Sequence, residues 1–169
     1  ITFRPPASGS YQLVGNSLQT GSIDCVADAL IACVITGTAG LTKSGNGALS
    51  LTGVCNYSGG TSINGGTLSL ESTTGDVAVR GTVTVNSGGI LRVAGADWAG
   101  LGTNSGKKIN VLNVVGGTVT NTLNTSFIKA AAINMTGGTI SGGEIHWDNS
   151  TLNSLASANS ATFASRIFI

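Results

Sequence analysis

Apolar residues recur along the chain mostly as pairs two positions apart, with one residue between them. Such alternation is typical of β-strands that bury one face. The pairs are Leu49 and Leu51, Leu68 and Leu70, Val77 and Val79, Val83 and Val85, Leu91 and Val93, Ile109 and Val111, and Ile133 and Met135. Gly, Asn, Ser or Thr bracket nearly every pair, and no segment stands out as helical. We therefore predict an all-β protein built from short strands.

Glycine pairs precede several of these strands at a spacing typical of a repeat. The motifs GGTLSL, GGILRV, GGTVTN and GGTISG begin at Gly65, Gly88, Gly116 and Gly137. An antiparallel sandwich would tolerate similar strands but gives no reason for the same dipeptide to return. We predict one parallel β-solenoid (β-helix) domain over residues 1–169, with coils of roughly 20–28 residues.

The glycines of these motifs, and those of the preceding turn, are predicted to lie where the chain needs a positive φ. The predicted turn glycines are Gly59, Gly60, Gly65, Gly66, Gly88, Gly89, Gly116, Gly117, Gly137 and Gly138.

The composition agrees with a solenoid. Only 9% of the residues are charged and 5% are aromatic, yet the mean hydropathy is +0.31. Equivalent positions in a parallel stack lie about 4.8 Å apart, so a repeated charge would face a like charge at every coil. Ladders of Thr, Ser and Asn avoid this repulsion and still form hydrogen bonds.

The charge distribution argues against two classes of partner. The formal net charge is +1 and the eight basic residues are scattered, whereas nucleic acid and anionic lipid both require clustered Lys or Arg. No apolar run is long enough to span a bilayer, and the run from Ala29 to Ile35 is far too short. We expect neither nucleic-acid binding nor membrane insertion. Because the chain begins with Ile1 and shows no signal peptide, we expect a processed or truncated start.

Three cysteines fit neither a metal cluster nor a dense disulfide framework. A bridge between Cys25 and Cys33 would close a short loop and leave Cys55 unpaired. The alternative is that all three are small buried apolar residues. The spacing does not decide between these two arrangements.

The stretch GLTKSGNGALSLTGVCNYSGGTSINGGTLSL closely resembles the autotransporter-associated β-strand repeat, and residues 40–72 are the clearest copy. Its first part matches the family at Leu41, Thr42, Lys43, Gly45, Gly47, Leu49, Leu51 and Gly53. Its second part matches at Tyr57, Gly59, Gly60, Thr61, Gly65, Gly66, Thr67 and Leu68. Cys55 departs from the family, whose repeat is normally free of cysteine.

This resemblance implies a passenger-type β-solenoid that is extracellular or on the cell surface after export, used as a stalk, adhesin scaffold or fibre. It implies no chemistry, because the shared residues are turn glycines and core aliphatics. The remaining residues are too few for the family's translocator domain, so we expect no self-translocation by this chain alone.

The residues GEIHWD hold the one cluster of catalytic residue types. On a strand, Glu144, His146 and Asp148 would share a face, with the two carboxylates roughly 13 Å apart at strand rise. Glycosidase carboxylates lie about 5 to 9.5 Å apart, so this spacing is wrong. We interpret the segment as a solvent-facing strand and predict a protein that is not an enzyme, with no cofactor and no metal.

Two further sets of side chains are candidate sites. Carboxylates from different coils can meet in solenoid glycosidases, and the candidates here are Asp24, Asp28, Asp76 and Asp97, but no paired Asp motif accompanies them. Trp98 and Trp147 could stack on a sugar ring. An adhesin or passenger fragment that binds glycans or host surfaces is therefore the alternative function to a structural one, and a glycan-cleaving β-helix enzyme is the third.

Both ends of the chain are apolar and strand-like, in ITFRPP and ATFASRIFI. A solenoid without caps exposes an open edge at each end, and open edges pair with other chains. We predict that residues 1–6 form an N-terminal arm and that copies of the chain self-assemble end to end into a filament or fibre. The predicted self-association residues are Ile1, Phe3, Phe163, Ile167, Phe168 and Ile169. The alternative is that both ends are cut from a longer passenger.

Overall fold

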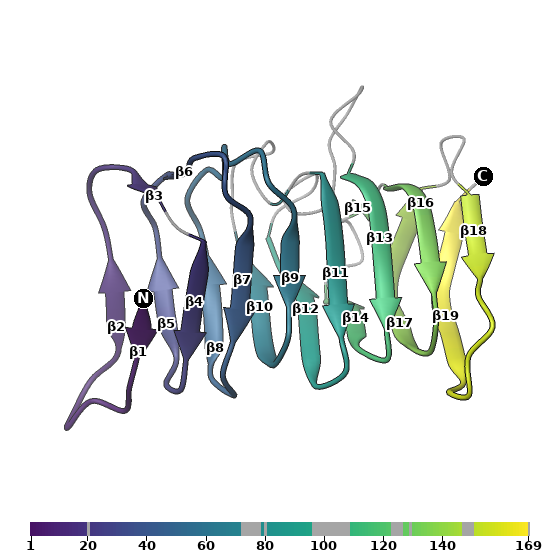
Figure 1. Cartoon of the computed structure of the whole chain (residues 1–169), viewed down its shortest axis with the longest axis horizontal. Coiled ribbons are helices and arrows are strands. Elements are labelled where there is room, and N and C mark those ends of the chain that lie inside the picture. The colour runs from purple at the N-terminus through teal and green to yellow at the C-terminus, as the bar shows by residue number, and fades with distance from the viewer. Residues whose placement is uncertain are drawn as a thin grey trace.

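The computed structural model describes residues 1–19, 21–71, 79, 81–95, 109–122, 127–128, 130–146 and 151–168. Within these ranges every regular element is a β-strand, and no helix is present that could cross a membrane. The chain winds into an elongated parallel β-solenoid of about six turns, with the two termini at opposite ends of the stack (Figure 1). The predicted fold class is confirmed.

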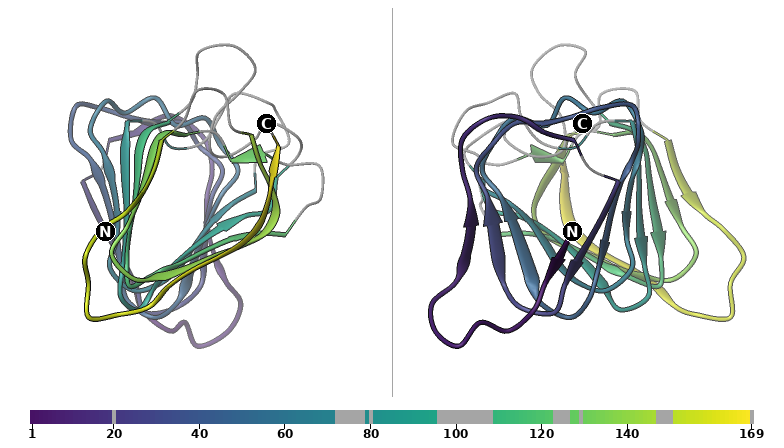
Figure 2. Two further views of the ribbon diagram at one scale, coloured as in Figure 1. Left: turned by 90° about the vertical axis from the view of Figure 1, so that its right-hand side faces the viewer. Right: turned by 60° about the vertical axis from the view of Figure 1, so that its left-hand side comes forward.

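Two long parallel sheets form the walls of the solenoid (Figure 2). Sheet A contains, in spatial order, β1 (Thr2–Phe3), β4 (Ser22–Cys25), β7 (Leu41–Ser44), β9 (Thr61–Ile63), β11 (Thr82–Asn86), β13 (Ile109–Val115), β16 (Ala130–Met135) and β18 (Thr151–Ser154). Sheet B contains β2 (Tyr11–Leu13), β5 (Ala29–Ile31), β8 (Ala48–Leu51), β10 (Gly66–Leu70), β12 (Gly89–Val93), β14 (Thr118–Asn121) and β17 (Gly138–His146), and both β15 (Phe127–Ile128) and β19 (Ala161–Phe168) pair with β17. A short third sheet pairs β3 (Leu18–Gln19) with β6 (Ile35–Thr36).

The strand register gives the length of each coil. Within sheets A and B, the shortest step pairs Phe127 with Glu144, and the longest pairs Thr82 with Val111. Successive steps along sheet B pair Gly66 with Gly89, Ile90 with Thr118, and Thr118 with Thr139. Each of these three steps equals the interval between the corresponding glycine motifs in the sequence, so the motifs recur once per coil.

The core is a set of apolar columns that run along the solenoid axis. One column follows the inward face of sheet B through Ala29, Leu49, Leu68, Leu91, Val119 and Ile140. Each of these side chains is buried, and burial of a Leu, Ile or Val contributes about 1.5–3 kcal/mol to folding. The predicted alternation is confirmed in β8, β10, β11 and β12, whose paired apolar residues are all buried. Of the predicted pair Val77 and Val79, Val79 is buried and Val77 lies outside the described residues.

The prediction of Ile109 and Val111 as an inward pair is wrong for Val111. Ile109, Leu112 and Val114 are buried, whereas Val111 is half-buried, so the alternation breaks once within β13. The alternation breaks at the equivalent position of β16, where the buried residues are Ala130, Ile133 and Met135. Because the two strands share the irregularity, Leu112 still pairs with Ile133 and both remain inward.

The predicted turn glycines serve two different purposes. Positive φ occurs at Gly66, Gly88, Gly116, Gly137 and Gly138. At most of the other predicted glycines, a side chain is excluded because the neighbouring coil leaves no space for it. A Cβ on Gly117 would lie 2.6 Å from the Asn86 carbonyl oxygen, and a Cβ on Gly60 would lie 2.7 Å from the Thr82 carbonyl oxygen. Gly59 and Gly89 face the neighbouring coil just as closely, whereas Gly65 would meet only ordinary contacts. A close approach between coils therefore requires glycine as often as the turn conformation does.

Residues 1–3, the first half of the arm predicted over residues 1–6, are paired with the next coil of the solenoid. Strand β1 pairs in parallel with β4, and the Ile1 amino group donates a 3.0 Å hydrogen bond to the Ser22 carbonyl. The Phe3 carbonyl accepts from the amides of Val26 and Ala27. These backbone bonds and the burial of Phe3 outweigh the break introduced by the prolines that follow.

Candidate functional site

The most unusual feature of the interior is a buried lysine that the sequence analysis treated only as part of a motif. Lys43 lies in β7 in an inward column, with Ile23 before it and Ile63 after it, and its side chain is fully buried. Its Nζ donates to three backbone carbonyls, those of Ser44 at 2.7 Å, Gly45 at 2.8 Å and Gly65 at 2.9 Å. The ammonium group therefore ties the corner of one coil to the corner of the next.

The surroundings of Lys43 explain how a charge is tolerated there. Burial lowers the pKa of the Lys43 ammonium, and the neighbouring carboxylates of Asp24 and Asp28 oppose that shift. Burial likewise raises the pKa of the Cys25 thiol, which keeps it protonated beside the carboxylates. Three hydrogen bonds to carbonyls replace the water that the ammonium loses, as a buried charge requires.

A second interior anchor comes from the same repeat. The Tyr57 and Thr61 hydroxyls lie 2.6 Å apart in a hydrogen bond, and both side chains are buried. Burial raises the pKa of Tyr57 well above its usual range, so the phenol stays neutral. The Tyr and Thr of the motif thus satisfy one another inside the coil.

All three cysteines are buried free thiols, so no bridge joins Cys25 to Cys33. Cys25 lies in β4 on the sheet A side, while Cys33 follows β5 on the sheet B side of the same coil. The backbone of Cys55 forms an isolated parallel β-bridge with Ile35 of the previous coil. Burial raises the pKa of the Cys55 thiol to about 12. Of the two arrangements that the spacing left open, the structure therefore agrees with three small buried residues and not with the Cys25–Cys33 bridge.

The candidate carboxylates do not meet at a catalytic centre among the described residues. Asp24 Oδ1 accepts from the Ser44 hydroxyl at 3.2 Å, and Asp28 Oδ1 accepts from the Ala48 amide at 2.7 Å. Both therefore join adjacent coils of the solenoid. Asp76 and Asp97 lie outside the described residues.

The GEIHWD segment is only partly described. Glu144 and His146 lie at the end of β17, after a register shift at Ser141, and they pair with Arg166 and Phe168 of β19. Asp148 and both tryptophans, Trp98 and Trp147, lie outside the described residues. No group of three or more metal-binding side chains occurs in the part of the chain that the structure describes.

The outward face of sheet A carries a ladder of amides. Asn113, Asn134 and Asn153 are register partners in three successive coils. Asn153 Nδ2 donates to Asn134 Oδ1 at 2.7 Å, Asn134 Nδ2 donates to Asn113 Oδ1 at 2.9 Å, and Asn113 Nδ2 reaches the Thr84 hydroxyl at 3.4 Å. Every bond of this Asn ladder points from a later coil to an earlier one.

The outward face of sheet B has a different polar cluster. Glu71 Oε1 accepts from the hydroxyls of Ser50 and Ser69, at 3.1 and 2.7 Å, and lies 3.2 Å from Arg92 Nη1. Both charged side chains are partly exposed, so their ion pair contributes little stability. The cluster links three coils through one carboxylate.

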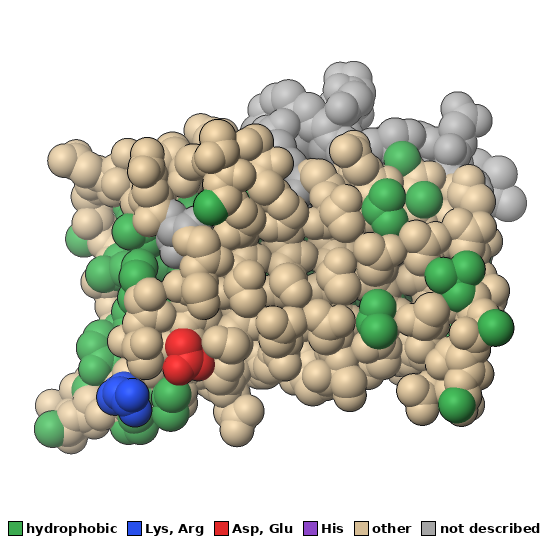
Figure 3. All heavy atoms as spheres, in the orientation of Figure 1, with side chains coloured by type: hydrophobic (Ala, Val, Ile, Leu, Met, Phe, Trp, Pro, Cys, Tyr) green, Lys and Arg blue, Asp and Glu red, His purple; other side chains and the backbone are tan. Residues whose placement is uncertain are grey.

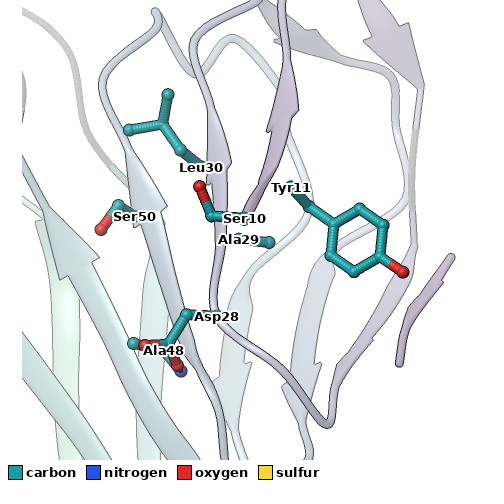
Figure 4. Close-up of a pocket in the computed structure, with 7 residues that line it drawn as sticks. All are labelled: Ser10, Tyr11, Asp28, Ala29, Leu30, Ala48 and Ser50. Carbon is teal, nitrogen blue, oxygen red and sulfur yellow. The ribbon is translucent and has the colours of Figure 1, made fainter. Parts of the chain in front are cut away.

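A shallow depression of about 180 Å³ lies near the N-terminal end of the same face (Figure 4). Ser10, Asp28, Leu30 and Ser50 line it from three neighbouring strands and their flanks, whereas the ring of Tyr11 points away from them. The depression is therefore lined by the Asp28 carboxylate, by two hydroxyl groups and by the apolar side chain of Leu30.

The two ends of the solenoid expose apolar side chains. Figure 3 shows apolar side chains gathered at the N-terminal end, on a face that is otherwise mostly neutral and polar. Ile1 is 49% exposed at that end, and Leu152 and Ile167 are 39% and 46% exposed in the last strands. Leu152 continues the inward column of Leu112 and Ile133, and no further described strand covers it.

The predicted self-association residues fall into different environments. Ile1 and Ile167 are exposed, whereas Phe3 is buried in its own chain and packs against Tyr11 with 5.3 Å between the ring centroids. Phe163 is partly buried against the core. Phe168 ends β19, and Ile169 lies outside the described residues.

Comparison with known proteins agrees with this architecture. Residues 41–70 match the family described as the passenger-associated-transport-repeat. The adhesin BmaC autotransporter of Brucella suis biovar 1 (strain 1330) is 36% identical to the chain over 91 residues, which cover 51% of this chain and 3% of that adhesin. The chain thus spans a small fraction of the curated relative it matches. No solved structure matches it.

The matched repeat contains the residues that form the interior anchors. Lys43, Tyr57 and Thr61 all lie within residues 41–70, and the glycines between them lie where adjacent coils touch. Repeat and relative together support a surface-exposed, adhesin-type passenger β-solenoid. The resemblance predicted from the sequence is confirmed: this chain carries the autotransporter-associated passenger repeat.

Proposed function

We propose that this protein is a non-enzymatic, extracellular β-solenoid scaffold whose copies associate end to end. The observation that carries the proposal is the exposed apolar surface at both ends: Ile1 at the first coil, and Leu152 and Ile167 at the last. Main-chain groups at an unpaired strand edge give affinity, and apolar side chains over an open core give a favourable area to bury. Heterologous contacts of this kind do not close on themselves, so they extend into a filament.

A structural role also fits the side chains that could otherwise be catalytic. Asp24 and Asp28 accept hydrogen bonds between coils, and Glu71 forms an ion pair with Arg92. Each carboxylate therefore has a role in holding coils together. Surface localisation after export is supported by the passenger repeat and by the adhesin relative.

Negative-stain electron microscopy and sedimentation velocity over a concentration series test the association. Uniform filaments, or a sedimentation coefficient that rises with concentration, are expected for the unmodified chain. Leu152→Glu places a charge over the open core and should leave single folded rods. Val115→Glu is the matched control, because Val115 is 41% exposed on the side of the stack. Isolated rods of the unmodified chain at every concentration would contradict the proposal.

The second candidate is glycan binding, which the depression at Asp28 favours. A carboxylate flanked by the Ser10 and Ser50 hydroxyls over Leu30 offers acceptors and donors for sugar hydroxyls beside an apolar surface. A glycan array with the unmodified chain, followed by Ser50→Arg, tests this candidate. Binding that disappears in Ser50→Arg and persists in Thr84→Arg, which changes the opposite sheet, would support it.

A further inference from the structure

An asparagine followed directly by glycine can modify itself, because the glycine nitrogen can attack the side-chain carbonyl carbon of the asparagine. Glycine leaves the most room for this attack, since it has no Cβ. The chain contains the dipeptide twice, as Asn46–Gly47 and as Asn64–Gly65. Each lies at a corner between sheet A and sheet B, the first between β7 and β8 and the second between β9 and β10 (Figure 1). Both asparagines are exposed, so the two corners can be compared directly.

The corner at Asn46 holds its glycine in place. The Gly47 amide donates a 2.7 Å hydrogen bond to the Cys25 carbonyl of the preceding coil. Gly47 is also buried, and a Cβ built on it would lie 2.6 Å from the Ala27 carbonyl oxygen. The Gly47 nitrogen is therefore bonded and enclosed, and it cannot move toward the Asn46 side chain.

The corner at Asn64 leaves its glycine free. A Cβ built on Gly65 would meet no atom closer than the Gly45 carbonyl oxygen at 3.5 Å. The corners of the coils before and after are both described, and the Gly65 amide donates no hydrogen bond to any described residue. The attacking nitrogen is therefore unbonded and has space around it.

The Asn64 side chain is polarised for attack. Its Oδ1 accepts from the Ser62 hydroxyl at 3.0 Å and from Asn86 Nδ2 at 2.7 Å. Donors at such distances stabilise the negative charge that develops on the oxygen when the carbonyl carbon is attacked. This corner therefore supplies an activated electrophile as well as a free nucleophile.

The buried ammonium of Lys43 bonds to the same glycine. Its Nζ lies 2.9 Å from the Gly65 carbonyl oxygen, so a positive charge lies close to the residue whose nitrogen must lose a proton. A nearby positive charge favours the deprotonated form of such a group.

We propose that Asn64 deamidates in the folded protein through attack by the Gly65 nitrogen. The bond between Gly65 N and Asn64 Cγ forms and the bond from Cγ to Nδ2 breaks. The Nδ2 group leaves as ammonia with the proton that Gly65 N loses. Water then opens the cyclic succinimide. Addition at Cγ gives aspartate, and addition at the main-chain carbonyl carbon of Asn64 gives isoaspartate.

The two products should affect the Lys43 anchor differently. In isoaspartate the main chain runs through the former side chain, which adds a carbon between Asn64 and Gly65. The Gly65 carbonyl then moves away from Lys43 Nζ, and the ammonium loses one of its three acceptors. Aspartate keeps the original main chain and should keep the anchor.

Peptide mapping by mass spectrometry, after incubation of the folded chain at mildly alkaline pH, measures conversion at both asparagines. Asn64 should convert on the order of 100-fold faster than Asn46, because a misplaced nucleophile costs about that factor. In concentrated urea the two rates should be similar, since no coil then encloses Gly47. Equal rates in the folded chain would overturn the proposal.

Gly65→Ala is the matched variant, because Gly65 has no positive φ and a Cβ there meets only ordinary contacts. It should keep the fold and slow conversion at Asn64 severalfold, since the Cβ crowds the attacking nitrogen. Unchanged conversion would mean direct hydrolysis of the side-chain amide and would overturn the role of Gly65.

Urea unfolding followed by circular dichroism tests the consequence for the anchor. The isoaspartate form, separated by chromatography, should unfold at a lower urea concentration than the fresh chain. Asn64→Asp reproduces the other product and should unfold close to the fresh chain. An isoaspartate form with an unchanged midpoint would overturn the link to Lys43 and leave the deamidation itself intact.

Discussion

The two halves of the solenoid are held together differently. In the N-terminal half, the passenger repeat over residues 41–70 places polar anchors inside the coil, with Lys43 bonded to three carbonyls and Tyr57 bonded to Thr61. In the C-terminal half, Asn113, Asn134 and Asn153 form their bonds on the outside. When an interior anchor is removed, water cannot reach its former partners to replace the lost hydrogen bonds, whereas water can do so for the exterior amides. The stability of the protein should therefore be more sensitive to substitutions in the first half.

The largest effect is expected at Lys43. In Lys43→Ala the carbonyls of Ser44, Gly45 and Gly65 lose their shared buried donor, and a cavity remains. We expect the free energy of unfolding to fall by about 3–5 kcal/mol. Urea denaturation followed by circular dichroism measures this change. A loss below about 1 kcal/mol would show that water reaches the corner and that the two halves do not differ in this respect.

A smaller loss is expected for Tyr57→Phe. The substitution keeps the ring in the core but leaves the buried Thr61 hydroxyl without its partner. We expect a loss of about 1–2 kcal/mol in the same denaturation experiment. The double variant Tyr57→Phe with Thr61→Val should recover part of this loss, because no polar group is then left unpaired.

The exterior ladder should matter less. Asn134→Ala removes two amide bonds at once, but solvent can hydrate the partners on Asn113 and Asn153. We expect a loss of about 0.5–1.5 kcal/mol. Thr136→Ala, two positions further along the same face, is the matched control. A loss as large as that of Lys43→Ala would abolish the distinction between the halves.

The pH dependence of stability sharpens the same comparison. The pKa of Lys43 is lower in the folded protein than the ordinary 10.5. At any pH between the lowered value and 10.5, the unfolded chain therefore binds more protons than the folded chain. Lys43 therefore makes the unfolding free energy increase through that window. Relative to Lys43→Met, the stability of the unmodified chain should rise with alkaline pH, while its stability relative to Asn134→Ala should not change.

Much of the fold could be predicted because a solenoid repeats. The intervals between glycine motifs equal the strand register in sheet B, and Leu68 and Leu91 stack as alternation predicts. The same approach failed at Val111, where one irregular step leaves the pattern unchanged in the sequence but shifts which residues face inward. The candidate site was harder to predict, since Lys43 lies between the polar Thr42 and Ser44 just before Gly45, as an ordinary solvent-exposed lysine near a turn would.

The sequence by itself determined the class of structure: strand periodicity, glycine spacing and the scarcity of charge all describe a parallel stack with neutral outer faces. The tertiary structure alone decided what each polar residue does. The Gly65 carbonyl that accepts from Lys43 belongs to the next coil, and Asn134 finds its partner Asn113 in the coil before it. Such partners are set by how one coil registers on the next, because side chains meet across coils that local sequence does not bring together.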